Sequence, residues 1–224
     1  MTMVHDAPAA THDAGHASSH AMPALPDGRY SAPAGHHPPS TIGVDNRKLL
    51  MWLFLASDCM FFGALIGTFL AYRGRSLVGP SPTEIFDIPY TSVSAFVLLM
   101  SSLTMVLALA AIQRNDPVRL RIWLFTTAAL GLVFIGGQYY EFSTFYAENL
   151  SLTTNLFGSS FFVLTGLHGT HVTIGILWLM YLAVASWRGR LNSEQSLFIE
   201  IAGLYWHFVD VVWIVIFTVV YLIP

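Results

Sequence analysis

Charged side chains are scarce in this sequence of 224 residues. Asp, Glu, Lys and Arg make up 10% of it and apolar residues 54%, whereas about 25% of an average soluble protein is charged. A water-soluble domain of this size needs more charge to cover its surface, so the composition predicts a membrane protein. The net charge of −3 gives no basic excess, which argues against nucleic acid as a partner.

Cysteine is nearly absent, and we do not expect the first residues to act as a secretion signal. Cys59 is the single cysteine, so an internal disulfide and a cysteine metal site are excluded, and we expect Cys59 to be a small buried residue. Residues 1–45 lack the apolar run of a signal peptide and hold six of the nine histidines. Their Ala, Pro, Gly, Ser and His content predicts a disordered tail, with a metal-binding tail as the alternative.

Five long, almost uncharged segments follow this tail. A membrane-spanning helix needs about 20 mainly apolar residues, and continuous apolarity is typical of helices rather than of barrel strands. The uncharged stretch 149–187 opens with the polar residues 151–155, which we interpret as a loop before one span. The predicted fold is an all-α membrane domain over 46–224, a bundle of five transmembrane helices at about 49–72, 90–113, 122–145, 157–187 and 201–223.

Lysine and arginine predict the orientation of the bundle, because they gather in cytoplasmic loops. Eight of the ten lie on one side, in the tail, the second loop and the fourth loop, and only Arg73 and Arg75 lie on the other. We therefore expect a cytoplasmic N-terminus and a C-terminus on the opposite, outer side.

The ionisable side chains within or bordering the spans are all acids or histidines. A charge near the bilayer centre costs several kcal/mol, so such residues face the bundle interior or a cavity and are candidate functional residues. The set consists of Asp58, Glu141, His168, His171, Glu200, His207 and Asp210.

The last two spans concentrate these groups. Glu200, Gly203, His207 and Asp210 are separated by three, four and three residues, which places them on one helix face. In the preceding span two histidines lie three residues apart, beside two glycines. Small residues permit close helix approach, and imidazoles can bond across the interface.

Three interpretations of the histidines stay open. A metal or haem site would need convergent ligands, and the only pair comparable to the Glu-x-x-His of di-iron bundles is His207-x-x-Asp210, in reverse order. A proton or solute carrier would use the buried acids but lacks the internal repeat typical of transporters. Interhelical hydrogen bonding within a catalytically silent bundle is the interpretation that the chemistry favours.

Two motifs then point to a family. The last span reads YWHFVDVVW over 205–213 and FTVVYL over 217–222, and the fourth reads GLHGTHVTIG over 166–175. Together they resemble subunit III of the haem-copper terminal oxidases, from Trp52 to the end of the chain. We assign a packing role to five motif residues, namely Gly166, Gly169, Gly175, Trp206 and Trp213.

The branch of the family can also be argued. Cytochrome c oxidase subunit III usually has seven helices and a Ser-Glu pair in its corresponding span, whereas this chain has five spans and Ser57-Asp58-Cys59. It also has the runs IFDIP over 85–89, before the second span, and QYYEF over 138–142, in the third. The short form, the triplet and the His-rich tail look like the cytochrome bo-type ubiquinol oxidase subunit III. Val209 replaces the Leu of that family's Trp-His-Phe-Leu-Asp run, and its Gly-Thr-His-Gly-Leu-His run is varied at Gly166-Leu167 and Thr170.

The resemblance implies a role within a complex of the aerobic respiratory chain. That complex oxidises ubiquinol, reduces dioxygen to water and pumps protons, with its haems and copper in the partner large subunit and none in this chain. The chain would be a non-catalytic neighbour of subunits I, II and IV in the bacterial cytoplasmic (inner) membrane, with its C-terminus periplasmic. It would bind phospholipid in a cleft and support assembly and proton uptake.

Alternatives within and outside the family remain. A subunit III of a cytochrome c oxidase or an accessory protein of a nitric oxide reductase could use the same bundle. From other classes, a stand-alone membrane haem or metal redox protein and a transporter also fit the composition.

The carried-over residues receive supporting rather than catalytic roles, in a lipid cleft or in proton uptake. Asp58 occupies the position of the family's buried acid in the cleft. We expect it to hydrogen-bond a histidine of another span, either His207 or His171. A second hypothesis is that Asp58 aids proton delivery to the large subunit.

Overall fold

The computed structural model describes residues 45–72, 87–147, 156–191 and 195–223. Its five long helices confirm the predicted all-α bundle, and each is long and apolar enough to cross a membrane. Most of the predicted tail, and the rest of the chain between and beyond these ranges, lies outside the described residues. The helices are α1 (Asn46–Tyr72), α3 (Ile88–Gln113), α4 (Pro117–Ala147), α5 (Leu156–Trp187) and α6 (Ser196–Phe217), and a π-helical turn, η2 (Thr218–Leu222), extends α6.

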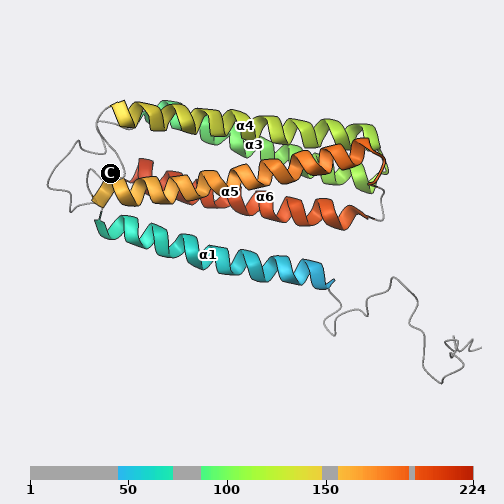
Figure 1. The fold of residues 1–224 in the computed structure, drawn as a ribbon, viewed down its shortest axis with the longest axis horizontal. Coiled ribbons are helices and arrows are strands. Elements are labelled where there is room, and N and C mark those ends of the chain that lie inside the picture. The colour runs from blue at the N-terminus through green and yellow to red at the C-terminus, as the bar shows by residue number, and fades with distance from the viewer. Residues whose placement is uncertain (1–44, 73–86, 148–155, 192–194, 224) are drawn as a thin grey trace, which may run out of the picture.

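The helices lie side by side and alternate in direction along the chain (Figure 1). In this view α3 and α4 form an upper pair, α5 and α6 lie beneath it, and α1 lies below those two. The main contacts of α1 are with α5 and α6, whereas α6 also packs on α3, and α5 on α4. Since α1 begins at one end of the bundle and η2 ends at the other, the two ends of the described chain lie on opposite sides of the bundle, as the odd number of spans requires.

Local sequence sets the helix ends at two tight turns. Asn115 has φ 55°, and its backbone N–H donates to the Ile112 carbonyl while that of Asp116 donates to Ala111. Gly189, with φ 67°, ends α5 in the same manner. Both follow the pattern in which a residue in the left-handed region closes the last turn, a place that Gly and Asn occupy most readily. Asp116 then caps α4, since its Oδ1 accepts from the backbone N–H of Arg119 at 3.1 Å.

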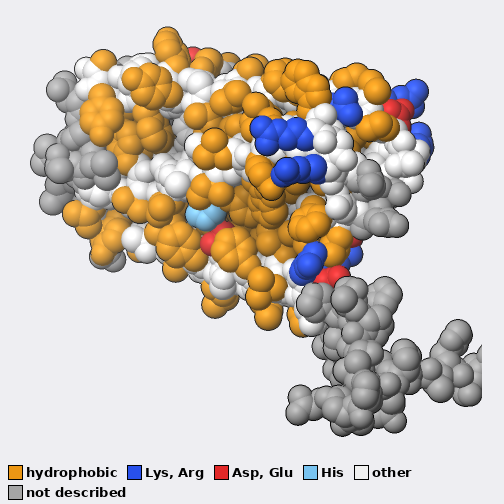
Figure 2. Space-filling view, turned by 45° about the vertical axis from the view of Figure 1, so that its right-hand side comes forward, with side chains coloured by type: hydrophobic (Ala, Val, Ile, Leu, Met, Phe, Trp, Pro, Cys, Tyr) orange, Lys and Arg blue, Asp and Glu red, His pale blue; other side chains and the backbone are white. Residues whose placement is uncertain are grey.

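Basic side chains gather at one end of the bundle. The seven described Lys and Arg residues lie at the start of α1, around the α3–α4 turn and just after α5. Figure 2 shows such residues toward one end of a face that is otherwise largely apolar. These positions match the side of the bundle on which the sequence placed most of the lysines and arginines.

Apolar side chains cover much of the outer surface, most of all on α1. Leu50 is 72% exposed and Met60 78%, as is suitable for contact with lipid or with another subunit. The expectation that Cys59 is buried is wrong, because this residue is exposed. Only one side of α1 meets other helices, and Cys59 does not lie on it.

Trp206 of α6 fills the space where α6 packs against α3, α4 and α5. It is 1% exposed, and its Nε1–H donates to Oγ of Ser101 on α3 at 2.9 Å. A Cβ atom added at Gly131 of α4 or at Gly175 of α5 would lie 2.8 Å from the indole ring. The ring therefore occupies space that these two glycines leave open.

The predicted packing residues divide into two groups. Trp213 is 2% exposed, and a Cβ at Gly169 would lie 2.8 Å from Oε1 of Gln138 on α4, so both lie at helix contacts. Gly166 does not, because a Cβ there would meet nothing within 4 Å in the described chain. The packing role predicted for Gly166 is therefore not matched by a contact among the described residues.

We predict that Gly175→Ala destabilises the protein by about 1–3 kcal/mol, the usual cost of overpacking a filled core. The added methyl group would lie 2.8 Å from the ring of Trp206, which is buried between helices. Gly166→Ala on the same helix is the matched control and should cost little. Thermal unfolding of the purified complex measures both, and an equal loss for the two variants would contradict the assigned contact.

Candidate functional site

Asp58 and His171 approach each other where α1 meets α5. His171 Nε2 lies 3.3 Å from Asp58 Oδ2, and both side chains are largely buried. The two atoms are within ion-pair distance, but their alignment does not make a hydrogen bond, and Oδ2 has no other partner among the described residues. Of the two histidines expected beside Asp58, the structure therefore places His171 there.

The second ring nitrogen of His171 determines the chemistry of this pair. Nδ1 lies 2.8 Å from the Leu167 carbonyl oxygen, and because a carbonyl only accepts, Nδ1 carries a proton. Nε2 and a carboxylate oxygen would then both be acceptors unless a further proton lies on one of them. A hydrogen bond between Asp58 and His171 would therefore require a proton on one of these two facing atoms.

His207 instead faces α3. Its Nδ1 lies 3.2 Å from Oγ of Ser102, and this hydroxyl donates to Oδ2 of Asp210 at 2.7 Å. Asp210 is buried, and its Oδ1 has no partner among the described residues. Gly203 lies against Met105 of α3 as well.

Glu200 lies on the predicted face of α6 but contacts a different helix from His207 and Asp210. It pairs with Lys48 of α1, whereas His207 and Asp210 turn toward α3. At 100° per residue, the positions 200 to 210 spread over roughly 80°, which is wide enough for the stripe to reach two neighbouring helices. Arg47, which lies 5.5 Å from the ring centre of Phe198, adds a second contact between the starts of α1 and α6.

His168 is fully buried between α5 and α6. Its Nε2 donates to the Val209 carbonyl oxygen at 3.1 Å, so this imidazole bonds across the helix interface as expected. The ring lies 4.9 Å from the ring of Trp213 and 5.9 Å from that of Phe134, between ring centres. These contacts fix the imidazole within an aromatic cluster.

Glu141 lies near the opposite end of the bundle from Glu200. Its Oε1 accepts from the hydroxyl of Thr91 on α3 at 2.8 Å and from that of Tyr221 in η2 at 3.1 Å. The carboxyl group thus joins α3, α4 and the C-terminal turn. The π-helical turn inserts an extra residue per turn relative to an α-helix and sets the direction from which Tyr221 reaches it.

The three histidines of the spans are committed to three different places. His168 bonds α6, His171 faces α1, and His207 faces α3. Accordingly, no cluster of three or more His, Cys, Asp or Glu suited to a metal occurs within the described residues. The donor set offers contacts between helices rather than convergent ligands.

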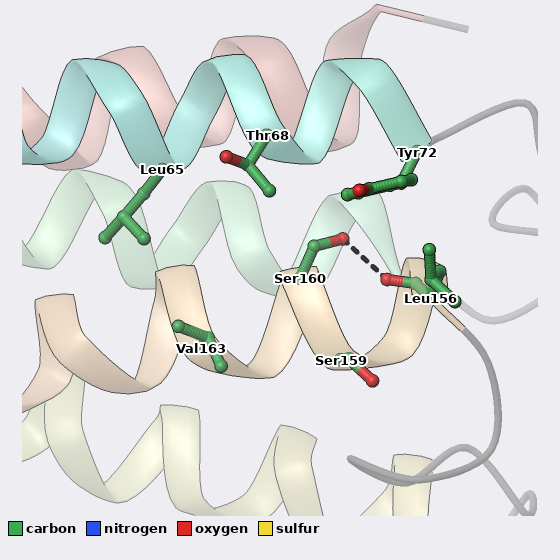
Figure 3. Close-up of a pocket in the computed structure, with 7 residues that line it drawn as sticks. All are labelled: Leu65, Thr68, Tyr72, Leu156, Ser159, Ser160 and Val163. Carbon is green, nitrogen blue, oxygen red and sulfur yellow. Dashed lines mark hydrogen bonds between the residues drawn. The ribbon is translucent and has the colours of Figure 1, made fainter.

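A pocket of about 220 Å³ opens between α1 and α5. Figure 3 shows Leu65, Thr68 and Tyr72 on α1 facing the side of α5 that carries Ser160 and Val163. The hydroxyls of Thr68 and Ser160 donate to carbonyls of their own helices. The surface of the pocket is mainly apolar, and the described residues that line it carry no charge.

Sequence reasoning missed the polar partners on α3 and α4. Ser101 and Ser102 bind Trp206 and Asp210, and Gln138 donates to the Thr165 carbonyl oxygen at 2.9 Å. The only sequence feature that could have indicated these contacts was the pair of serines in the middle of an uncharged span. A hydroxyl can also bond its own helix, so only the packing reveals which of them serve another helix.

Comparison with known proteins identifies close relatives over most of the chain. The family model described as Cytochrome c oxidase subunit III matches residues 30–223. Cytochrome c oxidase subunit 3 of Bacillus sp. (strain PS3) is 38% identical over 190 residues, covering 85% of this chain and 92% of that protein. The "Probable quinol oxidase subunit 3" of Staphylococcus saprophyticus is 40% identical over 177 residues, covering 79% and 88%. Relatives named for either electron donor thus match equally well.

We predict that Asp58→Asn and His171→Ala are not additive. Each removes one member of a contacting pair, so a double-mutant cycle should give a coupling of about 0.5–3 kcal/mol. Unfolding of the purified complex in denaturant measures it. The control is Asp58→Asn with His207→Ala, which should be additive because His207 contacts Ser102 instead; the reverse pattern would contradict the pairing.

Proposed function

Because the chain belongs to the subunit III family of the haem-copper oxidases, we propose that it is subunit III of a proton-pumping ubiquinol oxidase. As a family member it is an integral subunit of an oxidoreductase complex in a bacterial membrane, beside other oxidase subunits. The subunit is non-catalytic, and the haems and copper belong to subunit I. The proposal concerns the electron donor and what the bundle contributes.

The choice of ubiquinol rests on the form of the chain. Five spans and the Ser57-Asp58-Cys59 triplet resemble the bo-type quinol oxidase subunit, and one group of relatives is named for quinol. Cytochrome c is the second candidate donor, favoured by the names of the Bacillus relatives. The proposed partners are subunits I, II and IV, which would meet the exposed apolar faces.

The proposed orientation has the start of α1 in the cytoplasm and the C-terminus in the periplasm. Its support is the gathering of the seven described Lys and Arg residues at one end of the bundle, together with the preference of such residues for cytoplasmic loops. Residues 1–45 would form a cytoplasmic tail.

Phospholipid binding is proposed for the side of α1 that faces α5. The pocket lined by Leu65 and Val163 presents apolar side chains, and the hydroxyls of Thr68 and Ser160 in its wall already donate to backbone carbonyls. An acyl chain forms no hydrogen bonds and packs favourably against apolar side chains, so its chemistry matches the lining of this pocket. Asp58 and His171 lie on the same two helices.

Support of proton uptake is the third part of the proposal, and the Asp58–His171 pair carries it. Two acceptor atoms 3.3 Å apart accommodate one proton between them. Acids and histidines inside a membrane often form proton relays. We assign the pair the role of holding a proton for delivery to the large subunit.

We expect the purified complex to consume oxygen with a quinol as donor and only negligibly with reduced cytochrome c. An oxygen electrode measures both rates, and the optical spectrum of the complex reports its haems. Oxygen uptake driven by cytochrome c alone would overturn the quinol assignment in favour of the second candidate.

We further expect Asp58→Ala to lower proton uptake severalfold during sustained turnover, because His171 then has no carboxyl group with which to share a proton. Stopped-flow measurement with a pH dye follows this uptake in complexes whose spectrum shows normal assembly. Ser57→Ala is the matched control, since its hydroxyl donates only to the Phe54 carbonyl oxygen of its own helix. Unchanged oxygen consumption and pumping in Asp58→Ala would refute the assigned role.

A further inference from the structure

The contact between α3 and α6 contains a continuous chain of three polar side chains. Ser102 of α3 stands in the middle, with Asp210 Oδ2 at 2.7 Å and His207 Nδ1 at 3.2 Å from its Oγ. His207 is partly exposed and Asp210 is 4% exposed. The chain thus leads from the edge of the interface to a buried carboxyl group.

The hydroxyl of Ser102 couples the directions of its two hydrogen bonds. It has one proton to donate and lone pairs to accept with. When Asp210 is ionised, the hydroxyl donates to Oδ2 and must accept from His207 Nδ1–H. When Asp210 is protonated at Oδ2, the hydroxyl accepts from it and donates to an unprotonated Nδ1.

We propose that His207, Ser102 and Asp210 form a proton relay, with His207 as its entry and Asp210 as its buried store. A proton arriving at Nε2 makes an imidazolium. Its Nδ1 proton passes to Ser102 Oγ as the hydroxyl proton passes to Asp210 Oδ2. The products are a neutral imidazole protonated at Nε2, an unchanged serine and a neutral carboxyl, so protons and charge balance.

The surroundings of Asp210 suit both states. Its Oδ1 is buried and has no partner within the described part of the chain, and a neutral carboxyl has fewer acceptor positions to satisfy than a carboxylate. A hydrolytic triad is a poor alternative, because there the histidine stands between serine and acid. Here the serine occupies the middle position.

Other titratable groups approach from two helices packed on α6. His168 of α5 donates to the Val209 carbonyl, beside Asp210, and His171 of α5 faces Asp58 of α1. The α3 range 88–113 holds no acid, lysine, arginine or histidine. The relay is therefore separate from the Asp58–His171 pair, although both lie between helices of one bundle.

The relay specifies how the chain could support proton uptake, and its biological role rests on the function proposed above. Its own test needs no turnover. Infrared spectroscopy of the purified complex can follow the carboxyl band of Asp210, assigned by its loss in Asp210→Asn, and the rate at which it exchanges into deuterated buffer. If that variant does not assemble, ¹³C-labelled aspartate in complexes with and without Ser102→Ala identifies the band.

We expect Ser102→Ala to slow this exchange about tenfold or more, because positioned proton-transfer groups contribute at least that factor, and Ser102→Thr to restore it. Ser92→Ala is the control, since that hydroxyl donates to the Ile88 carbonyl of its own helix. Unchanged exchange in Ser102→Ala, or no Asp210 carboxyl band at any pH at which the complex is stable, would overturn the relay. An intact relay in an oxidase whose proton uptake is insensitive to Asp58→Ala would refute the proposed function alone.

Discussion

The packing of Trp206 against two glycines holds the bundle together. Its indole fills the space that Gly131 and Gly175 leave on α4 and α5, and its N–H reaches Ser101 on α3. One side chain of α6 thus meets three other helices. Between helices in lipid the hydrophobic effect gives little preference, because acyl chains are as apolar as leucine. Close packing and hydrogen bonds must therefore select the arrangement.

Most of the polar contacts described above follow from that arrangement, because they lie where α6 or α5 meets another helix. Lys48 and Glu200 join the starts of α1 and α6, while Glu141 binds Tyr221 toward the other end. Between them lie the Asp58–His171 pair and the His207–Ser102–Asp210 relay. Once Trp206 sets the distance and rotation of α6, His207 and Asp210 share one serine of α3, and His171 is left to face α1.

Much of the fold was predictable from the chain, and less of the site. Five almost uncharged runs predicted the helices, and the few acids and histidines within them marked the polar positions. Neither the role of Ser102 nor the choice of His171 over His207 beside Asp58 followed from spacing. Gly166 and Gly169 look equivalent in the motif, yet only Gly169 faces Gln138. These outcomes depend on how each helix is rotated about its axis.

The sequence by itself determined the number and length of the spans, the likeness to oxidase subunit III and the side of the bundle that carries the basic residues. These properties are local, since hydropathy and charge act along the chain. The tertiary structure decided which polar group meets which. Nearly every span is apolar on all its faces, so the sequence pattern does not show which face packs against other helices. The partner of each acid is determined only when helices distant in sequence come into contact.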